Sequence, residues 1–100
     1  GKKQLEEVIA SKKQLAQITS DIANARARIA DSTNDENRIR QNIQSLNRVS
    51  GQEQQVQKYA EQLAQQETQI ASLRDHLHDL ETNRAAAEAK VHTAIDKLDF

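Results

Sequence analysis

The chain has 100 residues, 29 % of them charged, with a formal net charge of −1, no proline, no cysteine and glycine only at positions 1 and 51. This length allows one domain, the lack of cysteine excludes disulfides and thiolate metal sites, and the balanced charge gives no general attraction to nucleic acid or anionic membranes. No apolar run approaches the roughly 20 residues of a membrane-spanning helix, and no secretory signal is visible. Because proline is absent and glycine is almost absent, the chain is predicted to be helical over nearly its whole length. Because Tyr59 and Phe100 are the only aromatics, we expect a thin aliphatic seam instead of a wide globular core.

A first helix is predicted over about residues 2–47. Gly1 directly before a lysine-rich helix start is unlike a natural terminus, so we expect the chain to be a piece of a longer protein. Apolar residues then recur at steps of three and four, which places them on one face of a helix. The stripe is Val8, Leu15, Ile18, Ile22, Ala25, Ile29, Ile39, Ile43 and Leu46. Its length is typical of a coiled coil.

Residues 31–35, Asp-Ser-Thr-Asn-Asp, form a polar cluster inside this helix, and such residues favour caps and turns. The apolar register nevertheless survives from Ile29 to Ile39. We therefore expect a continuous, locally weakened helix, with a kink or short loop as the alternative.

A turn is predicted at about residues 47–50, because the register breaks after Leu46. Ser50 and Glu53 fit a capping box at the start of a second helix. Asn47 suits a left-handed residue at the end of the first.

The second helix is predicted over about residues 51–98. Every residue of the first-helix stripe except Ile18 has an apolar partner equally far from Gly51, for example Ile22 with Leu80, Ala25 with Leu77, and Ile39 with Leu63. This mirror symmetry predicts an all-α fold, a single antiparallel two-helix coiled-coil hairpin over residues 1–100. A parallel homodimer of one long helix is the alternative, and the phase break at residues 47–52 argues against it.

Charge favours the same pairing. Residues 2–48 carry nine Lys or Arg and six Asp or Glu, a balance of +3, whereas residues 53–99 carry five and nine, a balance of −4. The register also places Glu7 near Lys90 and Lys97. Such exposed pairs contribute ~0–1 kcal/mol each and select orientation more than they stabilise.

Polar residues interrupt the seam at two layers. Glu36 faces Gln66, which predicts a partly solvated, register-fixing layer, with a hinge or partner-contact site as the alternative. Arg84 faces Ile18. We expect its stem to lie on the layer while its head reaches water, the alternative being a ligand-binding charge.

No residues are assigned to catalysis, to a cofactor or to a metal. His76 and His78 are two apart and point to different sides of a helix, whereas a helical metal pair needs a spacing of three or four. No catalytic motif occurs, and a two-helix hairpin is expected to offer no concave pocket for desolvating a catalytic group or binding a small substrate. We therefore expect a protein that is not an enzyme.

The outward helix faces are rich in alanine and glutamine. Alanine is a strong helix former, which explains most of these residues. The alternative is shallow contact with a second hairpin, forming a four-helix bundle, or with another domain. The residues are Ala16, Ala23, Ala27, Ala30, Gln65, Ala71, Ala85, Ala86 and Ala89.

Residues 36–73 carry a family resemblance. Arg38-Ile39-Arg40-Gln41-Asn42 precedes the turn, and Tyr59, Leu63 and Gln66-Glu67 follow it; the chain ends in Leu98-Asp99-Phe100. This arrangement resembles the C-terminal helical hairpin of a bacterial family of poorly defined function related to the mucoidy inhibitor A proteins. The resemblance implies a helical appendage of an envelope-associated or periplasmic bacterial protein, with no catalytic residues.

Together these patterns predict a structural or protein-interaction module, a spacer or docking arm of a larger protein, with a protein partner or a second copy of itself. The alternative is a nucleic-acid-binding arm, because the chain also resembles the helical hairpin of seryl-tRNA synthetases. Such an arm needs a basic face. Arg26, Arg28, Arg38, Arg40 and Arg48 give the first helix some positive character, but acidic residues of the second helix lie alongside.

Overall fold

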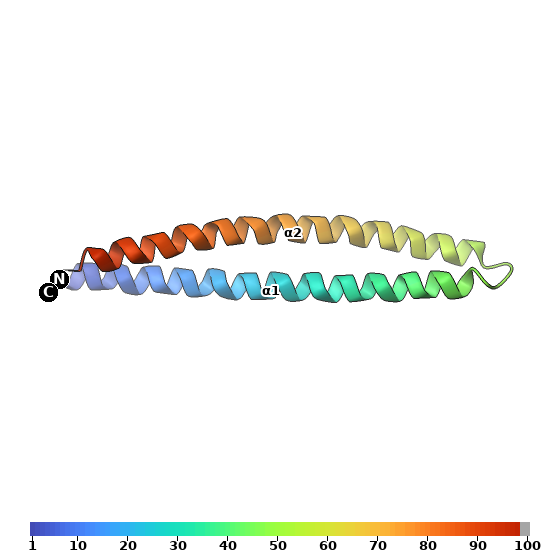
Figure 1. Cartoon of the computed structure of the whole chain (residues 1–100), viewed down its shortest axis with the longest axis horizontal. Helices are drawn as coiled ribbons and strands as arrows, with labels where there is room; N and C mark the ends of the chain where they lie inside the picture. Colours follow the sequence, from blue (N-terminus) through green and yellow to red (C-terminus); the bar gives the residue numbers. More distant parts are fainter. Residues whose placement is uncertain (99–100) are drawn as a thin grey trace. The chain divides into compact units, whose positions relative to one another are not determined.

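The structure is a computed structural model that describes residues 1–98, in which two helices are joined by one turn (Figure 1). Helix α1 spans Lys2–Leu46 and α2 spans Glu53–Asp96. They pack against each other in opposite directions, which confirms the predicted all-α helical hairpin. Helix α2 begins two residues later and ends two residues earlier than predicted. Asp99 and Phe100, which belong to the C-terminal tripeptide of the family resemblance, lie outside the described residues.

The turn occupies residues 47–52, two residues more than the sequence predicts. The last turn of α1 tightens: the Arg48 amide donates to the Ser45 carbonyl at 3.4 Å, and the Val49 amide donates to the Leu46 carbonyl at 3.0 Å. These hydrogen bonds join residues three apart, as in a 3₁₀-helix, and they satisfy carbonyls that would otherwise lack a partner at the helix end.

The predicted capping box at Ser50 is wrong. The Val56 amide donates to the Gln52 carbonyl at 3.0 Å, and Glu53 is already the first helical residue. Gln52 is therefore the N-cap, since its carbonyl accepts the first bond of α2. Ser50 lies two residues too early to satisfy an amide of the first turn. Glu53, in that first turn, instead complements the positive end of the helix dipole.

The predicted left-handed conformation of Asn47 is also wrong. Among residues 1–98, positive φ occurs at Gly51 alone, where φ is 83°. This conformation has little steric cost for glycine because it has no Cβ. The chain therefore reverses at Gly51, while Asn47 continues the α-helical hydrogen bonding through its amide, 2.9 Å from the Ile43 carbonyl.

Helix α1 continues without interruption through residues 31–35, as expected. The Thr33 hydroxyl donates to the Ile29 carbonyl at 2.8 Å, so its polar group is satisfied within the helix. Ser32 and Thr33 are half-buried on the seam side, and Asp31, Asn34 and Asp35 are exposed. The polar cluster is thus accommodated because its most polar members face solvent.

The contacts divide the hairpin into two compact units. We call Gly1–Ala25 with the described part of residues 76–100 the terminal unit, and Arg26–Asp75 the turn unit. The terminal unit is centred on Ile22, Ala25 and Leu80, with Ile18 and Leu77 packed against them. The mirror pairs Ile22 with Leu80 and Ala25 with Leu77 are therefore real layers of its core. Ile22 is 1 % exposed, and burying such a side chain contributes ~1.5–3 kcal/mol.

The turn unit has its buried apolar residues in one part of the seam, at Ile39, Ile70 and Leu73. Nearer the turn, the seam residues are only half-buried. They are Ile43, Leu46, Val56, Tyr59 and Leu63. Neither helix, over the described residues, has a stretch apolar enough to traverse a lipid bilayer.

Candidate interaction surfaces

Large apolar side chains lie outside the seam of the terminal unit. Leu5 is 48 % exposed, Ile9 is 49 % exposed and Ile95 is 41 % exposed. Leu5 and Ile9 are four residues apart on α1, so they share one face of the helix. The seam stripe does not predict this patch, because Leu5 and Ile9 do not belong to the stripe. The signal that could have found it is a set of large aliphatic residues that do not belong to the seam stripe.

The heptad positions of Leu5 and Ile95 show on which flank of the seam this apolar patch lies. In the turn unit, Arg40 of α1 pairs with Glu67 of α2 across one flank of the seam, with 3.2 Å between Nη2 and Oε1. Leu5 lies five heptads before Arg40 on α1, and Ile95 lies four heptads after Glu67 on α2. Heptad spacing returns a residue to the same side of a coiled coil. Leu5 and Ile95 therefore lie on the same flank of their own unit.

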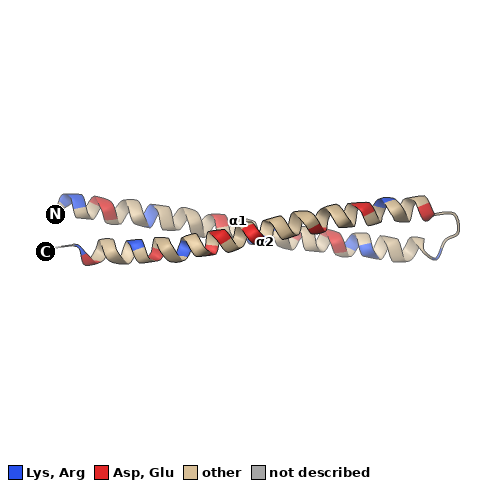
Figure 2. Ribbon diagram, turned by 90° about the horizontal axis from the view of Figure 1, so that it is seen from above, with Lys and Arg blue, Asp and Glu red and all other residues tan. Residues whose placement is uncertain are grey.

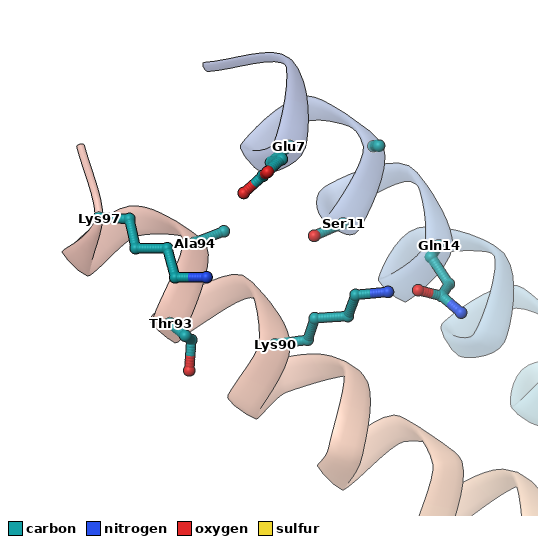
Figure 3. Close-up of a pocket in the computed structure, with 8 residues that line it drawn as sticks. Glu7, Ser11, Gln14, Lys90, Thr93, Ala94 and Lys97 are labelled. Atoms are coloured by element: carbon teal, nitrogen blue, oxygen red, sulfur yellow. The ribbon is translucent and has the colours of Figure 1, made fainter. Parts of the chain in front are cut away.

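The opposite flank of the terminal unit is hollowed into a groove of about 540 Å³ (Figure 3). Glu7, Lys90 and Lys97 all line this groove, which agrees with the predicted neighbourhood of these three residues. The Glu7 carboxylate and the Ser11 hydroxyl face α2, and Lys90 extends toward Gln14. Short side chains at Ala10, Ser11 and Ala94 leave the space between the longer ones open. The groove is open to solvent and most of its lining residues are exposed, so the absence of a pocket that desolvates a catalytic group stays a prediction.

Ser11 is a seam residue that sequence reasoning missed. It is 6 % exposed, and its mirror partner Val91 is 9 % exposed. The signal was present, because Ser11 lies three residues after Val8 and four before Leu15. A serine in this layer keeps the seam narrow, as Ala87 and Ala94 do in theirs.

A polar layer crosses the seam of the turn unit. Glu36 is 6 % exposed, and its carboxylate accepts from Arg40 at 2.9 Å. The same guanidinium reaches Glu67 on α2, so Arg40 ties the buried carboxylate to the opposite helix. Gln66 donates through Nε2 to the Asp35 carboxylate at 3.2 Å, again between the helices. Its Oε1 is buried and accepts no hydrogen bond.

The polar layer was predicted at Glu36 and Gln66, and both residues lie in the seam. The cross-helix partners Arg40 and Asp35 were not predicted. Their signal is positional: they flank Glu36 at four residues after and one residue before it. Buried ionic groups add little net stability even when paired, and a polar core layer is best known for fixing register in coiled coils.

Arg84 is half-buried, and its Nε lies 3.6 Å from the carboxylate of Glu88 on the same helix. The guanidinium of Arg84 therefore reaches out of the layer toward an exposed carboxylate. This agrees with the expectation that the stem lies on the layer while the charged head reaches water. Among the described residues, no three His, Asp or Glu side chains come together in a way that could hold a metal ion.

The positive character of α1 is partly neutralised. Arg40 pairs with Glu36 and Glu67, and Arg38 lies 3.5 Å from Asp35. Figure 2 shows basic and acidic residues interspersed along both helices. A continuous basic face of the kind that follows a phosphate backbone does not form at these arginines.

No family model, curated protein or solved structure matches the chain.

Proposed function

We propose that this hairpin is a non-enzymatic interaction module, a spacer or docking arm of a larger bacterial, envelope-associated protein. The observation that carries the proposal is the exposed apolar patch of Leu5, Ile9 and Ile95. None of these side chains belongs to the buried core, and each follows or precedes a buried seam residue, Val8 or Ala94, within three positions of the chain. Apolar side chains gathered on one face of a protein are typical of sites that another protein covers.

The long helices suit this role because they present side chains at fixed intervals. A helix rises 1.5 Å per residue, so a face of α1 repeats a contact about every 5 Å. The buried polar layer holds the pairing of the two helices in one register, which keeps such a face constant. The bacterial envelope enters the proposal through the resemblance of residues 36–73 to the family related to the mucoidy inhibitor A proteins.

Site-specific photo-crosslinking in living cells tests the proposal. A photoreactive amino acid replaces Ile9 in the full-length parent protein, and a control replaces Gln17 on the other flank of α1. We expect a discrete crosslinked protein from position 9 and none from position 17. Equal labelling at both positions, or none at position 9, would show that the patch is not a contact surface. Fractionation of the same cells tests the envelope location independently.

The alternative of a nucleic-acid-binding arm predicts a different result. Binding to transfer RNA or duplex RNA would weaken steeply as salt rises, because counterions are released from the phosphates. Substituting exposed Arg28 and Arg48 with glutamine would reduce that slope. Absence of salt-dependent binding removes this alternative.

A further inference from the structure

The exposed apolar patch belongs to a longer strip on the same flank of the terminal unit. Steps of three and four connect the members of each row. We call these residues the docking strip: Lys2, Leu5, Ile9, Lys12 and Ala16 of α1, with Ala85, Glu88, His92 and Ile95 of α2. All of them are exposed. The groove lined by Gln14 and Lys90 lies on the other flank and is not part of the strip.

We infer that the docking strip binds a second copy of this chain. The inference rests on the proposed interaction role and identifies the partner. In the arrangement we propose, a two-fold axis parallel to the helices places α1 of one copy on α2 of the other. Leu5 then lies against Ile95 of the second copy, Lys12 against Glu88, and Ala16 against Ala85. Every contact occurs twice, as a two-fold interface requires.

Charge complementarity selects this arrangement. The α1 row carries Lys2 and Lys12 and no acidic residue, whereas the α2 row carries Glu88 and no lysine or arginine. Placing α1 on α2 joins opposite charges, and placing α1 on α1 joins the lysine-bearing rows. Glu88 already has Arg84 at 3.6 Å, but its side chain is 59 % exposed and remains accessible to a second cation.

Small residues complete the fit. Ala16 and Ala85 occupy the same stretch of the strip, equally far from Gly51 to within one residue. Facing alanines let helix backbones approach closely, while the larger Leu5, Ile9 and Ile95 fill the end of the interface. In this arrangement each helix is antiparallel to both of its neighbouring helices. Such packing, with short connections, is typical of a four-helix bundle.

The available surface is sufficient. The chain has 7408 Å² of accessible surface, whereas a compact monomer of 11.3 kDa has about 5,700 Å². A stable dimer needs about 800 Å² from each partner. The excess of about 1,700 Å² per chain is roughly twice that amount.

Sedimentation equilibrium of the purified chain over a range of concentrations tests the inference. We expect a reversible dimer. Ile9→Glu, which enters the interface twice, raises the dissociation constant by about 100-fold. Gln14→Glu makes the same change in charge on the groove flank and leaves the constant unchanged. Circular dichroism of both variants verifies that the hairpin still folds, since both positions are exposed.

A charge exchange tests the geometry. Lys12→Glu alone and Glu88→Lys alone each place like charges together twice, and each weakens self-association by about tenfold. Mixing the two variants restores association, because every contact in the mixed dimer again joins opposite charges. Rearrangement within one chain cannot produce this recovery.

The outcomes separate the two proposals. A chain that is monomeric at all concentrations overturns the second-copy inference, as does a dimer that Gln14→Glu disrupts and Ile9→Glu does not. If a monomeric chain still gives a crosslink to a different protein at Ile9, the docking-arm proposal stands and the self-association inference fails. If the chain dimerises as described but the parent protein crosslinks only to itself, the strip is an assembly surface.

Discussion

The terminal unit and the turn unit share one heptad pattern, but different kinds of residue are buried between the helices in each unit. In the terminal unit, the buried apolar residues of α1 are Val8, Ile22 and Ala25, with Ser11 buried among them, while Leu15 and Ile18 are half-buried. In the turn unit, a glutamate occupies a buried layer, and the apolar layers nearer the turn are only half-buried. We infer that one heptad pattern can serve two purposes, because buried apolar residues stabilise both units and the turn unit also carries a polar layer suited to fixing register.

The largest expected effect comes from a charge placed in the seam. Leu80→Asp in the terminal unit and Leu73→Asp in the turn unit each bury an unpaired carboxylate at a residue that is 8 % exposed. We expect a loss of about 4 kcal/mol or more and a collapse of helicity, measured by circular dichroism. Ser72→Asp is the matched control, since it adds the same charge at an exposed neighbour. Full helicity in Leu73→Asp would show that the seam is not the source of stability.

Truncation of isoleucine compares the units more finely. Ile22→Ala in the terminal unit should cost about 2–5 kcal/mol, because it leaves a cavity beside Ala25 and Leu80. Ile43→Ala in the turn unit should cost about half as much, since Ile43 is only half-buried. Urea denaturation measures both. Equal losses would mean that the two units are packed alike.

Removing the polar layer should strengthen the turn unit. The double substitution Glu36→Leu with Gln66→Leu replaces two polar seam residues, one of which has a buried oxygen without a partner. We expect a gain of about 1–3 kcal/mol in the free energy of unfolding, together with a less unique pairing of the helices. Urea denaturation reports the gain, and spin-label distance distributions report the pairing. A double variant that is less stable, with one sharp distance, would contradict this role of the layer.

Arg40 should matter more than Arg38. Arg40→Ala removes the partner of a carboxylate that is buried and leaves Glu36 unpaired, at a cost of about 1–3 kcal/mol. Arg38→Ala removes an exposed pair with Asp35, worth ~0–1 kcal/mol. Thermal unfolding at low and high salt distinguishes the two, because salt screens the exposed pair more.

The smallest effect is expected at the turn. Gly51→Ala forces a Cβ into a left-handed conformation, at a cost of about 1 kcal/mol, although nothing lies within 4 Å of the added atom. Ser50→Ala should change stability by less than about 0.5 kcal/mol, because Ser50 does not cap α2. A larger loss at Ser50 than at Gly51 would restore the capping box that the structure excludes.

Periodicity was sufficient to predict the hairpin, because mirror spacing about Gly51 leaves few ways to bury Ile22 against Leu80. It also located the polar layer at Glu36 and Gln66. The details of the turn were mispredicted, since capping depends on where α2 starts, and Gln52 is not a residue type that marks a cap. The cross-helix pairs of Arg40 and Asp35 depend on side-chain reach, which spacing alone does not show. The exposed patch was missed because Leu5 and Ile9 do not follow the seam stripe.

The most direct test of the antiparallel pairing is a distance within the terminal unit. The chain has no cysteine, so spin labels can be attached at Ala10→Cys and Ala89→Cys, both exposed positions, and measured in an excess of unlabelled chain. Helices packed side by side have axes about 8–10 Å apart, so we expect a single short separation of about 15–25 Å between the labels. One uninterrupted helix would separate the same positions by about 120 Å, and a distance of that order would contradict the hairpin.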